Sequence, residues 1–317
     1  MVNPVLVCVS RGDLPESLHR GAIAVCDVDG KLIDCWGDTD RPVFPRSAVK
    51  PLQALALLES GAADRFALSD RELALASASH CADPCHLDLA GAWLARLGLS
   101  VADLECAGEP SALHNNCSGK HCGMLTTALH LGLPTAGYID AAHPVQQGIN
   151  AILCQLTGSP WPGTPWAVDG CGIPTLAFPL AGLATAMARF AAADGLAEPR
   201  RSAARRLLAA ITAHPELVAG RGRFCTEVMR AIPGIVVKGG AEGVQSAMLP
   251  ARGLGIAIKI DDGAARAAEV TLLAVLRHLG ALPAAAETAL AAWMPAAVTN
   301  VAGRRVGEIK ATLQGDL

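Results

Sequence analysis

The chain has 317 residues, which is enough for one large domain or two smaller ones with a well-packed core. Hydrophobic residues make up 51% of the chain and aromatic residues only 3%, so the core must be built mainly from Ala, Leu, Val and Ile. The net charge is −3 and no basic block occurs, which argues against a dedicated nucleic-acid binder. We therefore expect a protein that handles a small molecule.

No secretory signal is evident, because residues 1–13 lack a basic start and their apolar run is short. The most membrane-like stretch, residues 170–188, contains two prolines and many small residues, so we expect a buried helix there and no membrane association. Eleven cysteines without a signal predict free thiols, metal ligands or reactive groups instead of a disulfide framework. We expect a cytoplasmic protein.

The first part of the chain predicts strands. Residues 5–9 form a β-branched run, and residues 22–36 alternate around Asp29-Gly30, a favoured hairpin turn. The middle of the chain predicts helices that begin at N-cap or proline signals. These helices are expected at residues 84–97, 118–131, 144–156 and 200–212.

Strands return near the end of the chain, at residues 235–238, 243–249 and 254–260, and a helix follows over 264–279. Strands at both ends with helices between them predict an α+β fold, with one mostly antiparallel sheet that joins the two ends of the chain. We expect a single domain over residues 1–317, with a helical lobe at roughly 80–215 inserted in it.

A serine and a lysine stand three residues apart in PRSAVKPLQ, where a helix begins. Residues at this spacing share one face of a helix, so the Ser47 hydroxyl and the Lys50 amine are expected to approach each other. A lysine can activate an alcohol only when burial or other cations lower its pKa. Pro51 requires the helix to begin or bend within the motif. The alternative is a serine N-cap followed by a solvated lysine.

A second serine–lysine pair is available. Ser79 lies in the weakly polar stretch ASASH, and Lys238 ends a predicted strand just before a glycine turn. Penicillin-recognising enzymes complete a Ser-x-x-Lys site with a further serine and a strand-borne Lys-x-Gly. The sequence therefore predicts two pairs, Ser47 with Lys50 and Ser79 with Lys238.

The cysteines and histidines form two clusters. In NNCSGKHC, the residues alone favour a zinc site of Cys117 with His121 and Cys122. In HCADPCH, the metal-ligating types are His80, Cys81, Cys85 and His86. Pro84 is expected to start a helix inside the second cluster, so free thiols are its default interpretation and metal binding the alternative.

Seven motifs resemble the asparaginase II family, the group of the inducible, thermolabile rhizobial asparaginase. They are PRSAVKPLQ, ASASH, HNNCSGKHCGML, DGCGIPT, RFCTEVM, KGGAEGV and GIAIKIDDG, and they run from about residue 21 to residue 263. The resemblance implies a fold similar to serine β-lactamases and serine-dependent glutaminases. It also implies hydrolysis of L-asparagine to aspartate and ammonia through a serine acyl-enzyme, and a homodimer.

The resemblance implies a role for each matching residue. The catalytic residues would be Ser47 as nucleophile, Lys50 as its base, and the second tandem Ser79 and Lys238, with Lys259 as the rival for the last role. The zinc ligands would be Cys117, Lys120 and Cys171, with Asp169 beside the metal and Cys225 near the active site. Arg46 and His80 are candidates for binding the substrate, and the Gly239 region for supplying an oxyanion-hole N–H group.

Two other functions are compatible with the residues. One is a serine hydrolase of glutamine or a β-lactam. The other is a non-catalytic zinc-binding protein in which the serines are only helix caps.

Overall fold

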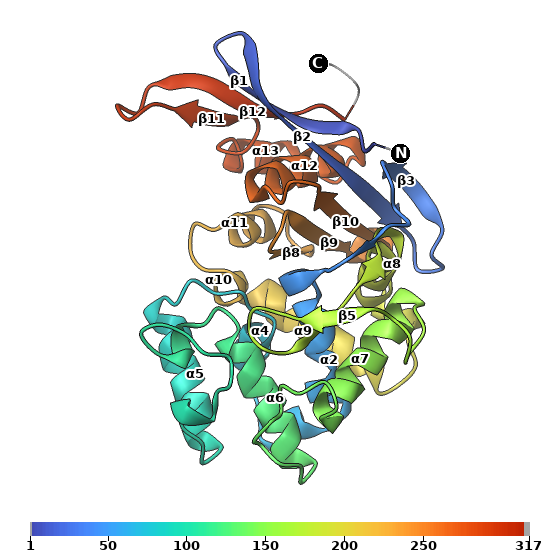
Figure 1. Ribbon diagram of the computed structural model, residues 1–317, viewed down its shortest axis with the longest axis vertical. Helices are drawn as coiled ribbons and strands as arrows, with labels where there is room; N and C mark the ends of the chain where they lie inside the picture. The colour runs from blue at the N-terminus through green and yellow to red at the C-terminus, as the bar shows by residue number, and fades with distance from the viewer. Residues whose placement is uncertain (1, 314–317) are drawn as a thin grey trace.

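The computed structural model describes residues 2–313. Strands from both ends of the chain lie together in the upper half of the molecule, and most of the helices fill the lower half (Figure 1). The main sheet has eight strands in the order β11-β12-β1-β2-β10-β9-β8, with β3 also paired to β2, and its described pairings are antiparallel. This sheet confirms the predicted α+β fold.

The strands of the sheet come from two parts of the chain. The N-terminal strands are β1 (Val5–Arg11), β2 (Leu14–Cys26) and β3 (Leu32–Trp36). The C-terminal strands are β8 (Val236–Gly240), β9 (Val244–Leu249), β10 (Leu254–Ile260), β11 (Ala296–Thr299) and β12 (Arg305–Ala311). The predicted turn joins β2 to β3, where Gly30 has φ 85° and the Asp27 carboxylate accepts from the Asp29 and Lys31 N–H groups.

The centre of the sheet is covered by helices. Strand β10 is buried along most of its length, and it packs against both α8 (Leu180–Ala191) and α12 (Ala265–His278). A Cβ atom at Gly255 would lie 2.0 Å from the Ala184 carbonyl oxygen, so only glycine lets α8 approach the strand this closely.

The remaining helices are short or of moderate length. They are α1 (Lys50–Gln53), α2 (Leu55–Glu59), α3 (Ala62–Arg65), α4 (Asp70–Ala76), α5 (Pro84–Arg96), α6 (Ser118–His130), α7 (Pro144–Thr157), α9 (Arg200–Ala213), α10 (Pro215–Val218), α11 (Phe224–Ala231) and α13 (Ala284–Ala289). The four helices predicted in the middle of the chain correspond to α5, α6, α7 and α9, each within one residue at either end.

The run at residues 170–188 differs from its prediction. It is not one buried helix, because β6 (Pro174–Leu176) and β7 (Phe178–Pro179) precede α8. Each strand contains a proline, which has no N–H group for a helix interior. These short strands pair with β5 (Trp166–Val168) and β4 (Pro42–Val43), respectively.

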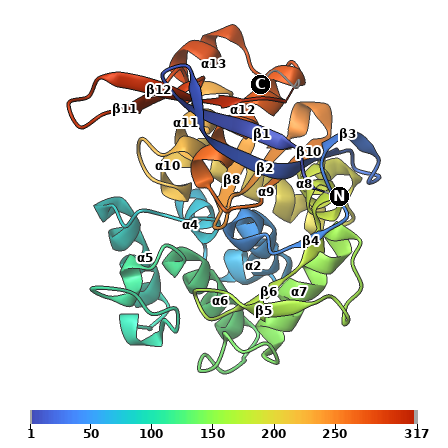
Figure 2. The ribbon, with the colours of Figure 1, turned by 45° about the horizontal axis from the view of Figure 1, so that its top comes forward.

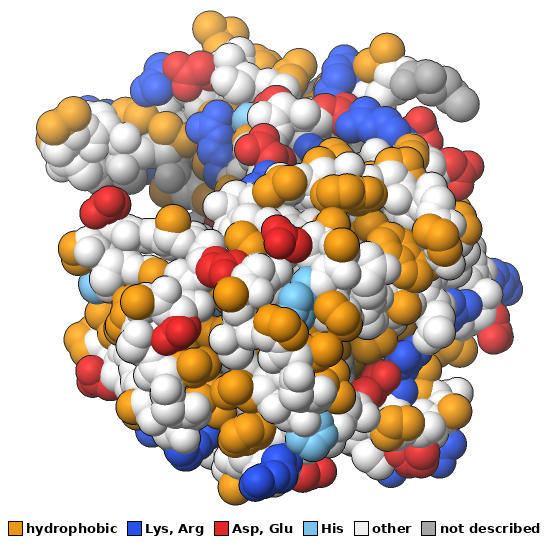
Figure 3. Space-filling view, turned by 60° about the horizontal axis from the view of Figure 1, so that its bottom comes forward, with side chains coloured by type: hydrophobic (Ala, Val, Ile, Leu, Met, Phe, Trp, Pro, Cys, Tyr) orange, Lys and Arg blue, Asp and Glu red, His pale blue; other side chains and the backbone are white. Residues whose placement is uncertain are grey.

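Over residues 2–313, no helix is both long and apolar enough to cross a bilayer. The face in Figure 3 carries acidic and basic side chains scattered among hydrophobic ones, without a large area of one charge.

Candidate active site

The Ser-x-x-Lys motif lies at the boundary between the sheet and the helices. A 3₁₀ turn, η1 (Arg46–Val49), leads directly into α1, with Pro51 in the first turn of that helix. The helix thus begins inside the motif, as Pro51 requires. Lys50 is only 1% exposed, so the alternative of a solvated lysine is wrong. Arg46 adopts φ 51°, a conformation that costs a non-glycine residue about 1–3 kcal/mol and is common at functional sites.

Two lysine amines meet at one serine hydroxyl. Lys50 Nζ lies 2.9 Å from Ser79 Oγ, and Lys238 Nζ lies 2.7 Å from the same oxygen. The segment that carries Ser79 is held by its neighbours, since the Ser79 N–H donates to the Val218 carbonyl and the His80 N–H to that of Asn116. Figures 1 and 2 both show β8, which carries Lys238, on the side of the sheet that faces the helices, and this strand contacts η1, α9 and α11.

The partners of Lys50 determine where its lone pair points when the amine is neutral. Lys50 Nζ also lies 2.6 Å from the Ala78 carbonyl and 3.2 Å from Asn116 Oδ1, and both of these oxygens can only accept. Ser79 is the one partner of the three that has a proton to give. A neutral Lys50 would therefore accept its hydrogen bond from Ser79. Lys238, whose other partner is the Gly239 carbonyl at 2.8 Å, can then donate to the same oxygen, because the single Ser79 proton goes to only one amine at a time.

Burial favours neutral amines at this point. It lowers the pKa of Lys238 to about 7, with a further contribution from the charge of Lys50. Burial likewise lowers the pKa of Lys50 from its usual value. Two ammonium groups facing one hydroxyl would repel each other, so the arrangement favours at least one uncharged lysine.

Ser47 is placed differently from its predicted pairing. Among residues 2–313, no hydrogen bond joins the Ser47 hydroxyl to Lys50, which turns toward Ser79 instead. The backbone of Ser47 packs against the end of β8, because a Cβ atom at Gly240 would lie 3.3 Å from the Ser47 nitrogen. Ser47 thus lies next to the strand that carries Lys238.

Lys259 and Cys225 were two further candidates for this site, and only Cys225 lies close to β8. Lys259, the alternative to Lys238, donates to the Glu242 and Ile260 carbonyls and lies away from Ser79. Cys225 lies beside Gly239: a Cβ atom added to Gly239 would be 3.7 Å from the Cys225 sulfur. The same sulfur accepts a hydrogen bond from Gln245 Nε2.

The candidate substrate-binding side chains are already paired with protein groups. Arg46 Nε donates to Asp169 Oδ1 at 2.7 Å, in a partly buried ion pair. His80 accepts from the Ala82 N–H through Nδ1, so its Nε2–H donates to Ser118 Oγ at 2.8 Å. Burial lowers the pKa of His80 to about 3, which keeps the ring neutral. Both ring nitrogens are therefore engaged.

The three implied zinc ligands lie together in the interior. Cys117 is the N-cap of α6, Lys120 lies one turn into that helix, and Cys171 comes from the loop before β6. Lys120 Nζ lies 3.1 Å from Cys171 Sγ, and all three residues are at most 5% exposed. His121 and Cys122 point elsewhere, to the Tyr138 hydroxyl and the Ala90 carbonyl. The zinc site suggested by residue types alone is therefore wrong.

The chemistry of these three side chains fits a zinc ion. A hydrogen bond from the Cys171 thiol, against the effect of burial, lowers the pKa of Cys117 to about 4 and favours its thiolate. Burial opposes a charged Lys120, but the charge of Cys117 and the hydrogen bond to the Cys171 sulfur outweigh it and raise the pKa of the amine. Two sulfurs and one nitrogen are donors that zinc accepts, provided that the metal displaces the proton of the amine.

Asn116 connects the lysine cluster to the cysteines and was not singled out from the sequence. Its Oδ1 accepts from Lys50 Nζ at 3.2 Å and lies 3.1 Å from the Cys117 sulfur. Its position next to the CSGK motif is the only sequence signal that could have indicated it.

The HCADPCH segment brings together a different set of side chains from the His80, Cys81, Cys85 and His86 that the sequence suggested. Donor atoms of Cys81, Asp83 and His86 lie within 4.8 Å of one another, and this triad could hold a metal ion. All eleven cysteines of the chain are free thiols.

A cavity of about 550 Å³ lies elsewhere, between α12 and β12. It is at the opposite end of the strand order from β8 and includes none of the residues described above.

The architecture defines a class of mixed α/β proteins in which the sheet joins both chain ends and the helices are inserted. A solved structure of Mglu in its glutamate form shares this fold, with a TM-score of 0.50 and 18% identity over 83% of this chain and 61% of that one. Mglu in its native form gives a TM-score of 0.49 at 16% identity, covering 84% of this chain and 66% of that one. A β-lactamase from Burkholderia ambifaria gives 0.40 at 17% identity, covering 82% and 95%.

The chain spans less than two thirds of the length of these Mglu chains. A comparison with curated proteins gave no match. Residues 7–311 match the family described as L-asparaginase II, and the chain therefore belongs to that family.

Proposed function

We propose that this protein hydrolyses L-asparagine to aspartate and ammonia through a serine acyl-enzyme. Membership of the L-asparaginase II family supports the substrate. The observation that carries the mechanism is the Ser79 hydroxyl held between two buried lysine amines at 2.7 and 2.9 Å. A hydroxyl between a neutral amine and one that has taken up a proton can give up a proton and receive one, as amide hydrolysis requires.

In this proposal Ser47 is the nucleophile and Ser79 relays the proton. Ser47 Oγ attacks the side-chain carbonyl carbon of asparagine, and its proton passes to the lysine network through Lys50. The carbon–nitrogen bond then breaks, and ammonia leaves with a proton delivered by Ser79. Ser79 recovers this proton from Lys238, after Lys238 has taken up the Ser47 proton by way of Lys50 and Ser79. Water adds to the acyl-enzyme, returns a proton to the network and releases aspartate.

Polar groups around the serines would hold the rest of the substrate. The Ser47 N–H and one N–H from the Gly239 region would stabilise the oxyanion, and each such donor typically contributes about 10²–10³ in rate. Arg46 and Asp169, an ion pair at 2.7 Å, offer opposite charges for the α-carboxylate and the α-ammonium of asparagine. His80 would orient the Ser79 segment, because both of its nitrogens are engaged.

Cys117, Lys120 and Cys171 would hold a zinc ion. When bound, it would supply a fixed positive charge that braces the pocket and orients a polar substrate group.

The test compares ammonia release from asparagine and glutamine, and hydrolysis of a chromogenic β-lactam, by the wild type, Ser47→Ala and Ser79→Ala. We expect turnover of asparagine and a loss of roughly 10⁴-fold or more in Ser47→Ala, because losing a nucleophile has effects of this size. Zinc content, measured in each variant, should stay unchanged.

Mass spectrometry of the quenched enzyme would identify the acylated residue. We expect an aspartyl adduct on Ser47. An adduct on Ser79 would exchange the roles of the two serines, and full activity in both alanine variants would contradict the serine mechanism. No turnover of any of these substrates by a zinc-loaded wild type would favour the non-catalytic zinc-binding protein. The homodimer implied by the family is checked by light scattering.

A further inference from the structure

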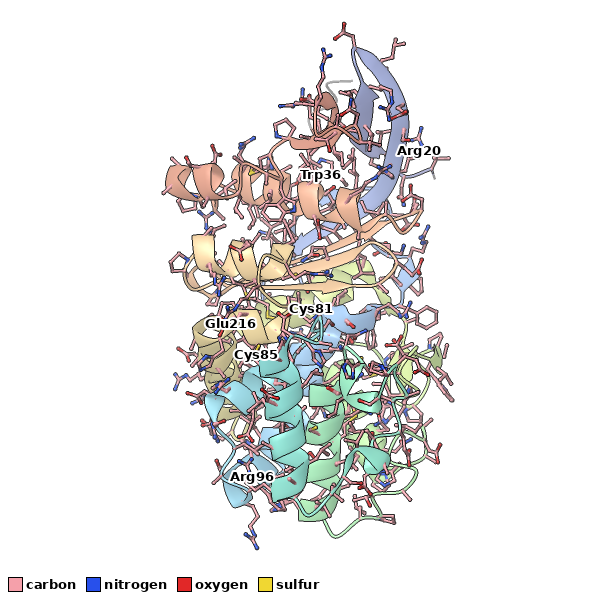
Figure 4. All side chains as sticks on the ribbon, turned by 90° about the vertical axis from the view of Figure 1, so that its left-hand side faces the viewer. Arg20, Trp36, Cys81, Cys85, Arg96 and Glu216 are labelled. Carbon is pink, nitrogen blue, oxygen red and sulfur yellow. The ribbon has the colours of Figure 1, made fainter. Side chains whose placement is uncertain are left out.

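A second group of metal-ligating side chains lies between Ser79 and α5. Cys81, Asp83 and His86 each offer one donor atom, and the three atoms lie within 4.8 Å of one another. Figure 4 shows Cys81 and Cys85 at one end of α5 with Glu216 beside them, whereas Arg96 marks the other end of that helix. None of these side chains belongs to the Cys117, Lys120 and Cys171 group.

The hydrogen bonding of His86 prepares its ring for a metal. His86 Nε2 lies 3.0 Å from the Glu216 carbonyl oxygen, which can only accept, so Nε2 carries the proton. Nδ1 is then unprotonated, and its lone pair has only a long contact with the Cys85 sulfur, at 3.9 Å, which an ion can displace. This is the usual arrangement of a metal-binding histidine, whose other nitrogen donates to a carbonyl or carboxylate that fixes the ring. His86 is fully buried, so the orientation of the ring is also fixed by packing.

The backbone holds the other two ligands close to His86. Asp83 is the N-cap of α5, and its carbonyl accepts from the His86 N–H at 2.8 Å. Ala82, between Cys81 and Asp83, has φ 59°, which turns the chain sharply at this point. Cys81 packs against Gly220 but is exposed, so an ion can reach the group from solvent.

The balance of charge also favours a cation. The N-terminus of α5 opposes it with a charge of about +0.5, whereas a thiolate and a carboxylate together supply about two negative charges. One sulfur, one imidazole nitrogen and one carboxylate oxygen form a donor set suited to zinc and its borderline relatives, and unsuited to magnesium or calcium.

We propose that Cys81, Asp83 and His86 form a second, surface-accessible site for a divalent transition metal of the zinc type. The Cys81 sulfur, a carboxylate oxygen of Asp83 and His86 Nδ1 are its ligands, and the ion displaces the thiol proton of Cys81. The site is linked to the catalytic segment, because the rings of His86 and His80 stack at 4.9 Å and His80 follows Ser79 directly. A bound ion therefore ties the Ser79 segment to the start of α5.

The test counts ions bound by the full-length chain in equilibrium dialysis against Cd²⁺, a spectroscopic substitute for zinc, together with thiolate-to-metal charge-transfer absorption. We expect Cys81→Ser and Asp83→Asn each to bind one Cd²⁺ fewer per chain than the wild type. Both changes are nearly isosteric, and neither residue is fully buried, so folding should be preserved and is checked by circular dichroism.

Cys35→Ser is the matched control, because it removes another exposed thiol from strand β3. It should leave the number of bound ions unchanged, and Cys117→Ser should retain the ion that Cys81→Ser loses. Equal binding by wild type and Cys81→Ser would overturn the proposal. An unchanged count in Asp83→Asn would do the same, because it would reduce the site to a lone thiol.

Discussion

At the scale of single residues, the ionisation of the Lys238 amine should determine how the hydrolysis of asparagine depends on pH. Its pKa of about 7 means that the amine is protonated below neutral pH and loses its proton as pH rises through 7. Only the neutral form can accept the Ser79 proton. We therefore expect kcat/KM for asparagine to rise with pH through a single ionisation near 7, measured as ammonia release between pH 5 and about 9.

Lys238→Arg should remove this ionisation, because a guanidinium stays charged throughout the range. Lys259→Arg is the matched control and should keep the wild-type profile, since Lys259 lies apart from Ser79 and donates to two carbonyls. If Lys238→Arg retained the same rising limb, the titrating group would be a different one.

At the scale of elements, the contact between β8 and η1 sets the position of the Ser-x-x-Lys motif. A Cβ atom at Gly240 would lie 2.6 Å from the Pro45 carbonyl and 3.2 Å from the Ala48 nitrogen. Because both neighbours are backbone atoms, Gly240→Ala must push η1 away from the strand. Overpacking of this kind typically destabilises by about 1–3 kcal/mol.

We expect Gly240→Ala to lower asparagine turnover by at least about tenfold, since shifts near 1 Å at reacting groups can have effects up to about 10²-fold. Urea unfolding measures the accompanying loss of stability. Gly148→Ala, on the exposed side of α7 with no atom near its Cβ position, should keep full activity and gain about 0.5–1 kcal/mol. Wild-type activity in Gly240→Ala would show that the contact does not position the serine.

The helices and strands themselves illustrate what the sequence could predict. Local signals, such as Asp83-Pro84 before α5 or the Asp29-Gly30 turn, act within a few residues and specified those elements closely. Strands β11 and β12 were missed, because β12 pairs with β1 across nearly the whole chain and β11 joins the sheet only through β12. Pro174 and Pro179 marked the strands before α8, but the apolar composition around them favoured a helix.

At the scale of the whole molecule, the candidate site combines segments that are far apart in sequence. Ser79 meets lysines from α1 and β8, which lie 29 and 159 residues away along the chain. Spacing alone paired Ser47 with Lys50, and only the fold shows that Lys50 turns to Ser79. Asn116 was missed for the same reason, since its importance comes from two neighbours that no local pattern connects.

The Cys117, Lys120 and Cys171 group joins α6 to the loop before β6, so the proposed zinc ion should contribute to the stability of the whole fold. A ligand that binds only the folded chain raises the free energy of unfolding by RT ln(1 + [L]/Kd). The measurement uses the Cys81→Ser variant, which lacks the proposed surface ion. We expect a chelator to lower the Tm of this variant. Calorimetry measures Tm, and metal analysis measures the zinc content before and after chelation.

Adding Cys171→Ser to this background should abolish the remaining zinc and lower Tm, after which the chelator should have no further effect. The two perturbations act on one interaction, so their effects should not add. Cys154→Ser changes another buried thiol, whose partner is the Thr164 hydroxyl, and should keep both the zinc and the response to the chelator. A full zinc complement after Cys171→Ser would mean that other side chains hold the ion. In that case α6 and the loop before β6 would be joined by packing alone.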